Sequence, residues 1–240
     1  MVNTPAAENK DNTGIYLYNA ILKSSNSPIL VKNAKKTILH LVKGTSNVVE
    51  DGKGDHLFVT VNGKQDTAKA AIYSKDDMNI KGAGKLTVTS NFKNGIQSSN
   101  DLKIKNGDIT VVAEDNGIKS KGSLEVSGGT LNITAKAGDG LESDECEKDA
   151  LDSCINIIEG KGIVNISGGA ITIVTATEGI EAYKIFAEGG VTSTFATDDG
   201  WNGAGGPKDG NATGMLSMLS ESGGYIVISG GYHYIMQRVT

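Results

Sequence analysis

The stretch Asn116-Gly117-Ile118-Lys119-Ser120 decides the fold, because its order of glycine, apolar, polar and small residue recurs along the chain. The other copies of this pattern are Gly95-Ile96-Gln97-Ser98, Gly140-Leu141-Glu142-Ser143, Gly179-Ile180-Glu181-Ala182 and Gly200-Trp201-Asn202-Gly203. Successive copies are about 22 residues apart, except where an insertion at residues 144–160 lengthens one interval. A turn pattern repeated at such a period is typical of stacked repeats, because one repeat alone cannot bury its apolar face.

Each repeat also contains short stretches in which apolar and polar residues alternate. Leu124-Glu125-Val126 and Leu131-Asn132-Ile133-Thr134 flank the turn Ser127-Gly128-Gly129, and other repeats have the same order. Alternation with a period of two, bounded by Gly and Ser, indicates β-strands. An antiparallel sandwich shares this alternation but has no fixed turn period. We therefore predict an all-β fold, a right-handed parallel β-helix (solenoid) with about 22 residues per coil.

Composition agrees with this fold and limits the domain organisation. The chain has 240 residues, 32 glycines and only 3 prolines, which suits many short strands joined by tight turns. We predict a polar tail or linker at 1–13 and a single domain at 14–240, with the insertion at 144–160 and a long loop at 202–224. Further strands that join the solenoid are expected at 15–18, 29–31, 37–41 and 57–61. Short helices are expected only at 144–153 and 214–220.

The charge of the chain excludes some classes of partner. Net charge is −5, and Arg238 is the single arginine, so a nucleic-acid partner is not expected. No run of 18 apolar residues is present, so we expect no membrane span, and no signal peptide is visible. Cys146 and Cys154 lie within the insertion, and a disulfide between them is favoured over two free thiols.

Stacking of the coils brings acidic residues together in columns. The same repeat position in neighbouring coils is separated by roughly 4.8 Å, and like charges this close disfavour each other's ionised forms. Calcium, which takes six to eight oxygen ligands, would relieve the repulsion. The candidate ligands are Asp115, Asp139, Glu142, Asp144, Glu178, Glu181, Asp198 and Asp199. The alternative is that these acids are ordinary turn residues in solvent, partly neutralised by Lys119 and Lys184.

The motifs Asp115-Asn116-Gly117-Ile118, Gly138-Asp139-Gly140-Leu141 and the Ser-Gly-Gly turns resemble a clostridial family of extracellular carbohydrate-binding β-helix proteins. The resemblance implies a fold similar to pectate lyases, bound calcium, and binding of acidic plant polysaccharide without established catalysis. The ligand implied is polygalacturonate or pectin, with cellulose as a second one. It also implies export, so an extracellular or cell-surface location is expected, with the signal segment absent from this chain.

A binding mechanism follows from the charges. Calcium with open coordination positions could bridge protein carboxylates to uronate carboxylates. The candidate sugar contacts are Lys119, Tyr183, Lys184 and Trp201. One alternative is a calcium-dependent pectate lyase that uses Lys119 or Lys184 as its base. Another is a calcium-stiffened structural module of the cell surface that binds no sugar.

Overall fold

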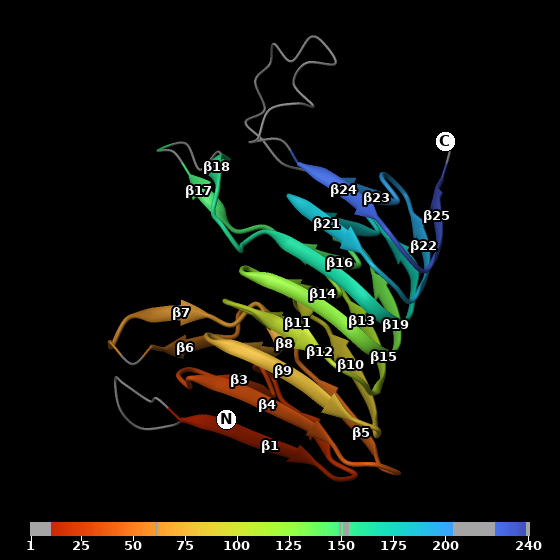
Figure 1. Ribbon diagram of the computed structural model, residues 1–240. Coiled ribbons are helices and arrows are strands. Elements are labelled where there is room, and N and C mark those ends of the chain that lie inside the picture. Colours follow the sequence, from red (N-terminus) through yellow and green to blue (C-terminus); the bar gives the residue numbers. More distant parts are fainter. Residues whose placement is uncertain (1–10, 61, 149, 151–153, 204–223, 239–240) are drawn as a thin grey trace.

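The computed structural model describes residues 11–60, 62–148, 150, 154–203 and 224–238 (Figure 1). Within these ranges every regular element is a β-strand, and the strands are stacked from β1 at one end to β24 and β25 at the other. The same residues contain no helix long and apolar enough to cross a membrane. The prediction of an all-β fold is confirmed.

Most strands belong to three rows of parallel strands. The first row consists of β1 (Asn12–Leu17), β4 (Lys36–Leu41), β9 (Asp77–Gly82), β12 (Leu102–Ile104), the first halves of β15 (Ser123–Ala135) and β19 (Ile163–Ala176), β21 (Lys184–Ala187) and β24 (Tyr225–Ile228). The second row consists of β2 (Ile21–Lys23), β5 (Ser46–Glu50), β10 (Lys85–Ser90), β13 (Asp108–Ala113), the second halves of β15 and β19, β22 (Val191–Ala196) and β25 (Tyr232–Gln237).

The third row forms a separate seven-stranded sheet. Its strands are β3 (Ile29–Val31), β8 (Ala70–Ser74), β11 (Asn94–Ser98), β14 (Ile118–Ser120), β16 (Leu141–Ser143), β20 (Ile180–Ala182) and β23 (Trp201–Gly203). The chain visits the rows in turn, as in β9, β10, β11 and then β12, β13, β14. β15 and β19 pass through the first two rows without a break, so these rows form one 14-stranded sheet.

The recurring four-residue pattern stands in register across the third row. Ile96 pairs with Ile118, which pairs with Leu141, and Leu141 pairs with Ile180. These four side chains are fully buried and belong to one apolar cluster that strands of all three rows share. Two residues after this apolar position, small residues form a second inward column. Its members Ser74, Ser98, Ser120 and Ser143 are also fully buried.

The glycine of the pattern is required by close packing. A Cβ atom on Gly117 would lie 2.7 Å from the carbonyl oxygen of Gly140 and would overlap the side chain of Ile133. Gly95 and Gly140 are confined in the same way by the carbonyl oxygens of Gly117 and Gly179. The sequence pattern predicted turn glycines at these positions, but the reason is the close approach of neighbouring backbones.

The inward serines satisfy backbone carbonyl groups at the corners. Ser120 Oγ donates to the carbonyl oxygens of Asn100 at 2.5 Å and of Ser123 at 2.9 Å. We expect Ser120→Ala to lower the free energy of unfolding by about 1–2 kcal/mol, because the fully buried hydroxyl and the hydrogen bond that it donates at this corner are lost. Urea unfolding of the variant measures this loss, with the exposed Thr172→Ala as a control that is expected to stay within about 0.5 kcal/mol of wild type. Equal midpoints for the two variants would contradict the expectation.

Two antiparallel hairpins differ from what the sequence predicted. The segment 57–61 was expected to join the parallel stack, but β6 (Leu57–Val59) pairs antiparallel with β7 (Gln65–Thr67). The segment 144–153 was expected to be helical, but β17 (Cys146–Lys148) pairs antiparallel with β18 (Cys154–Ile157). Strand alternation has the same period in both sheet types, so it does not separate them.

The remaining boundary predictions are only partly covered by the structure. β1 begins at Asn12, inside the expected tail 1–13. β23 includes Asn202 and Gly203, which the sequence assigned to the loop 202–224. The rest of that loop up to residue 223, and with it the helix expected at 214–220, lies outside the described residues. Cys146 is disulfide-bonded, and Cys154, the other cysteine of the sequence, lies in the paired strand β18.

Candidate functional site

From β8 to β23, the residue that follows the inward apolar residue of each third-row strand lies on the opposite face of the strand. Pairing places these residues in one column: Tyr73, Gln97, Lys119, Glu142, Glu181 and Asn202. Successive side chains of a strand alternate between its two faces, so this column lies opposite the buried isoleucines. Its composition changes along the row, from a lysine at β14 to two glutamates at β16 and β20. The outer face of the third row therefore carries the acidic residues expected from the sequence.

A second column lies at the turns that lead into these strands. Asn94 Oδ1 accepts a hydrogen bond from the backbone N–H of Asn116 at 3.2 Å, and Asn116 Oδ1 accepts one from Asp139 N–H at 2.7 Å. Asp139 Oδ1 continues the series by accepting from Glu178 N–H at 3.2 Å. Each side chain thus satisfies the backbone of the next repeat. These bonds hold Asp139 in a fixed position beside the outward glutamates.

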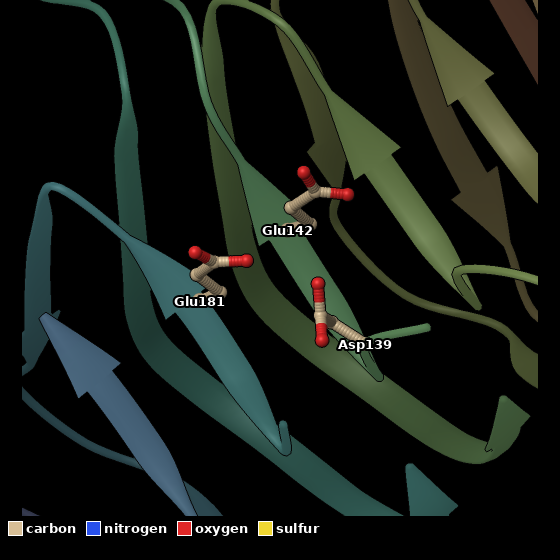
Figure 2. A group of neighbouring side chains, drawn as sticks. All are labelled: Asp139, Glu142 and Glu181. Atoms are coloured by element: carbon tan, nitrogen blue, oxygen red, sulfur yellow. The ribbon is translucent and has the colours of Figure 1, made fainter. Parts of the chain in front are cut away.

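Asp139, Glu142 and Glu181 converge on one point of this face. One carboxylate oxygen from each residue lies within 4.8 Å of the other two. Figure 2 shows Glu142 on β16, Glu181 on the neighbouring β20, and Asp139 at the turn before β16. Asp139 and Glu142 are only 8% and 7% exposed, so the cluster is largely withdrawn from solvent. We call these three residues the acidic triad.

The triad favours its protonated forms. Burial raises the pKa of Glu142 to about 7, against the attraction of Lys119, and the charge of Asp144 adds to the rise. Burial, followed by the charges of Asp139 and Glu178, raises the pKa of Glu181 to about 8. The pKa of Asp139 is also raised by burial, although a hydrogen bond from Glu181 opposes this. These shifts favour a protonated Glu181 that donates a hydrogen bond to Asp139.

Lys119 is the cation that lies against the triad. Its Nζ is 2.5 Å from Glu142 Oε1 and 2.9 Å from Asp144 Oδ2. Burial lowers the pKa of Lys119, but the charges of Glu142 and Asp144 outweigh burial and raise it to about 12. The amide of Asn116 also donates to Glu142 Oε2. One ammonium group among these carboxylates leaves an excess of negative charge.

The other predicted ligands lie around the triad. The charge of Asp115 contributes to the raised pKa of Asp139. Burial raises the pKa of Glu178, whose Oε2 accepts a hydrogen bond from Asn202 at 2.9 Å, and the charges of Asp199 and Asp198 raise it further. Asp198 and Asp199 are exposed. The structure therefore separates the triad, in which Asp139 and Glu142 are buried and Glu181 is half-buried, from a more exposed group at the end of the row.

The four predicted sugar contacts differ in their burial and in their distance from the triad. Trp201 pairs with Ile180 in the inward column, is 8% exposed, and donates from Nε1 to Thr194 Oγ1 at 3.2 Å. It does not offer the exposed flat face that stacking on a sugar requires, which corrects the prediction. Tyr183 is also largely buried, at 9% exposed. Lys184 lies in the first row, with its Nζ 5.4 Å from the centre of the Tyr225 ring. Lys119 faces the predicted site, and the Tyr183 hydroxyl lies beside it, 3.5 Å from the carbonyl oxygen of Asp144.

A groove continues the outer face on the side of Lys119 away from Glu181. It has a volume of about 590 Å³ and is lined by five lysines, Lys69, Lys75, Lys93, Lys119 and Lys121, and by four acidic residues, Asp66, Asp115, Asp144 and Glu145. Because the lysines are in excess, we call it the basic groove. Four of these lysines were missed from the sequence. The repeat pattern contained a signal for these four lysines, because each lies three residues before or after the buried isoleucine of a repeat.

Comparison with known proteins gives the family. Residues 3–238 match the family described as carbohydrate-binding domain-containing protein. A protein of that description from Acetivibrio thermocellus is 46% identical over 94 residues, which are 39% of this chain. The match spans 32% of that relative's own length.

A solved structure is similar over nearly the whole chain. It is described as the polysaccharide lyase-like protein from C. thermocellum, gadolinium derivative. The TM-score is 0.60 at 29% sequence identity, over 96% of this chain and 76% of that one. The resemblance to a clostridial carbohydrate-binding family, predicted from the turn motifs, is confirmed. This chain belongs to the family of carbohydrate-binding domain-containing proteins.

Proposed function

We propose that this protein binds acidic plant polysaccharide, such as polygalacturonate or pectin, in a calcium-dependent manner and without catalysis. The observation that carries the proposal is the acidic triad of Asp139, Glu142 and Glu181, whose carboxylates converge on the outer face of the third row. The family supports a carbohydrate ligand. The excess of carboxylates over cations at the triad supports a divalent cation between protein and ligand.

The donor set of the triad fits calcium. Three carboxylates supply only hard oxygen atoms, and calcium accepts such ligands in flexible geometry. Bound there, calcium would neutralise the cluster and offer open coordination positions to a uronate carboxylate. The hydrogen bonds from Asn116 and Lys119 hold Glu142 in place, and the turn column holds Asp139. Without a cation, this acidic face and a polyuronate would repel each other.

The two lysines considered as a lyase base, Lys119 and Lys184, are poorly suited to that role. A general base must lose its proton near the working pH. Lys119 is ion-paired with two carboxylates and has a pKa raised to about 12. Lys184 belongs to the first row and lies over the Tyr225 ring. These positions favour binding over elimination chemistry.

Further parts of the proposal concern fold and location. We propose that the three rows form a right-handed parallel β-helix, because the chain visits them in a constant order and parallel crossovers prefer that hand. An extracellular or cell-surface location agrees with the disulfide-bonded Cys146, since disulfides persist in oxidising compartments. Cellulose is proposed as a second ligand with less support, because buried Trp201 provides no platform.

Retention on immobilised polygalacturonate tests the calcium mechanism. In high salt, which screens exposed ion pairs, we expect wild-type protein to be retained with calcium and released by a chelator. The double variant Glu142→Gln/Glu181→Gln is expected to lose at least about tenfold in calcium-dependent affinity, because two ligand carboxylates become amides. The control Glu159→Gln/Glu188→Gln makes the same charge change at exposed positions and is expected to bind as wild type does.

The outcomes separate the three candidate functions. Retention that a chelator leaves unchanged would sink the calcium bridge. A rise in unsaturated-uronide absorbance during incubation would establish a lyase instead. No binding to any uronate polymer, together with stabilisation by calcium, would leave the structural module.

A further inference from the structure

The basic groove is rich in positive charge, whereas the protein as a whole is negatively charged. Net charge is −5, yet five lysines line one groove on the outer face of the third row. Lys75 is paired with Asp66 at 2.8 Å, and Lys119 is paired with Glu142 and Asp144. Among the described residues, Lys69, Lys93 and Lys121 make no ion pair. Four acidic residues line the same groove: Asp66, Asp115, Asp144 and Glu145. Asp66 and Asp144 are already ion-paired with Lys75 and Lys119, so the groove presents three ammonium groups outside ion pairs, of which Lys69 lies near enough to Asp66 to lower its pKa.

Parallel stacking places these lysines along the two edges of the groove. The N–H of Asn94 bonds to the carbonyl of Lys69, and the N–H of Asp115 bonds to that of Lys93, so both lysines lie at one turn of neighbouring repeats. At the other edge, Lys121 N–H bonds to the carbonyl of Ser98. Neighbouring positions along an edge are separated by about one strand spacing of 4.8 Å. The positive charges thus follow the axis of the stack.

Polar groups form the floor between these edges. Tyr73 and Gln97 occupy the outward column, and the Tyr73 hydroxyl is within 2.9 Å of Ser99 Oγ. Gln97 Oε1 accepts a hydrogen bond from Asn94 at 3.0 Å. Hydroxyl and amide groups at the floor, with ammonium groups at both edges, match a ligand that carries hydroxyls and regularly spaced carboxylates. A neutral glucan would leave the ammonium groups without partners.

We propose that the basic groove is a second binding subsite, which takes uronate residues of the same polysaccharide by direct ion pairs from Lys69, Lys93 and Lys121, without calcium. This inference rests on the proposed function for its ligand class. Lys119 and Asp115 border both the groove and the triad, so the two subsites are continuous along the third row. One polysaccharide chain can occupy both subsites, bound by the lysines at one end and by the acidic triad at the other.

Binding of a short galacturonate oligosaccharide in a chelator tests the groove separately from the triad. We expect wild-type protein to bind it in low salt, and to bind it less tightly as salt rises, because exposed ion pairs are screened. The variant Lys69→Gln/Lys93→Gln/Lys121→Gln is expected to bind roughly tenfold more weakly, from three exposed ion pairs. The matched control Lys43→Gln/Lys53→Gln/Lys105→Gln removes the same charge at exposed positions outside the groove, and should stay within about twofold of wild type.

The failures of the two proposals are distinguishable. No binding by wild type in chelator, with binding in calcium, would overturn the groove and leave the proposed function intact. Equal losses in the groove variant and the control variant would also overturn it, because net charge alone would then explain the effect. Conversely, binding that survives in Glu142→Gln/Glu181→Gln in chelator, but is lost in the groove variant, supports the groove whatever calcium does.

Discussion

The substitution Gly117→Ala is expected to lower the melting temperature by roughly 6–12 °C. The new Cβ would lie 2.7 Å from the Gly140 carbonyl oxygen and would overlap the Ile133 side chain. Neither neighbour can move easily, since one is backbone of the next strand and the other is a buried core residue. Overpacking of this kind costs about 3 kcal/mol, which for a chain of this size corresponds to that fall in melting temperature.

Gly14→Ala provides the matched control. A Cβ on Gly14 would meet only the ring edge of Tyr16, at 3.3 Å, and Tyr16 is 68% exposed. The ring can turn away, so the melting temperature of this variant is expected to change by less than about 2 °C. Differential scanning calorimetry of both variants measures the contrast. A Gly117→Ala protein as stable as Gly14→Ala would show that the third row can open at that position.

In the presence of a chelator, the protein is expected to lose stability as pH rises from about 5 to about 9. The pKa values of Glu142 and Glu181 are raised in the folded state to about 7 and about 8, from an ordinary value of 4.5. Folding therefore favours the protonated carboxyls, and this contribution is complete below pH 4.5. It is lost as pH rises through 7 and 8, because ionisation is easier in the unfolded chain.

The size of this loss of stability can be derived from Glu142, the more buried of the two glutamates. For Glu142 the shift corresponds to on the order of 3 kcal/mol, or roughly 10 °C in melting temperature. Calcium is expected to restore most of this loss at pH 8–9, because a ligand that binds only the folded state stabilises it. The variant Glu142→Gln/Glu181→Gln should show a flatter pH profile and little response to calcium. An equal response to calcium in that variant would place the stabilising ion elsewhere.

The sequence was sufficient for the all-β fold, and it included the three triad residues among its eight candidate ligands. A fixed repeat reveals which residues share a column, so Asp139, Glu142 and Glu181 could be placed together before their contacts were known. The burial of Trp201 could have been predicted as well, because it occupies the position of Ile118 in the pattern.

Other features depend on information that periodicity lacks. The hairpin of β6 and β7 alternates just as a stacked strand does, and only its pairing distinguishes it. The insertion has no counterpart in the other repeats, so its strands β17 and β18 were not visible in the pattern. The basic groove differs from these two cases, because Lys69 and Lys93 share a column with Asp115 and Asp198, so the repeat itself could have indicated it.

The shared register of the third row makes the repeat an interchangeable unit of length. Deleting residues 96–117 would join Gly95 to Ile118 and bring Ile118 beside Ile72, with the inward serines still in line. The triad would remain whole, whereas the lysine-lined side would become shorter by one strand spacing, about 4.8 Å. Gain or loss of a single repeat would thus change the length of this surface, and with it the number of sugar residues of the proposed ligand that fit, without any change in the acidic triad at one end.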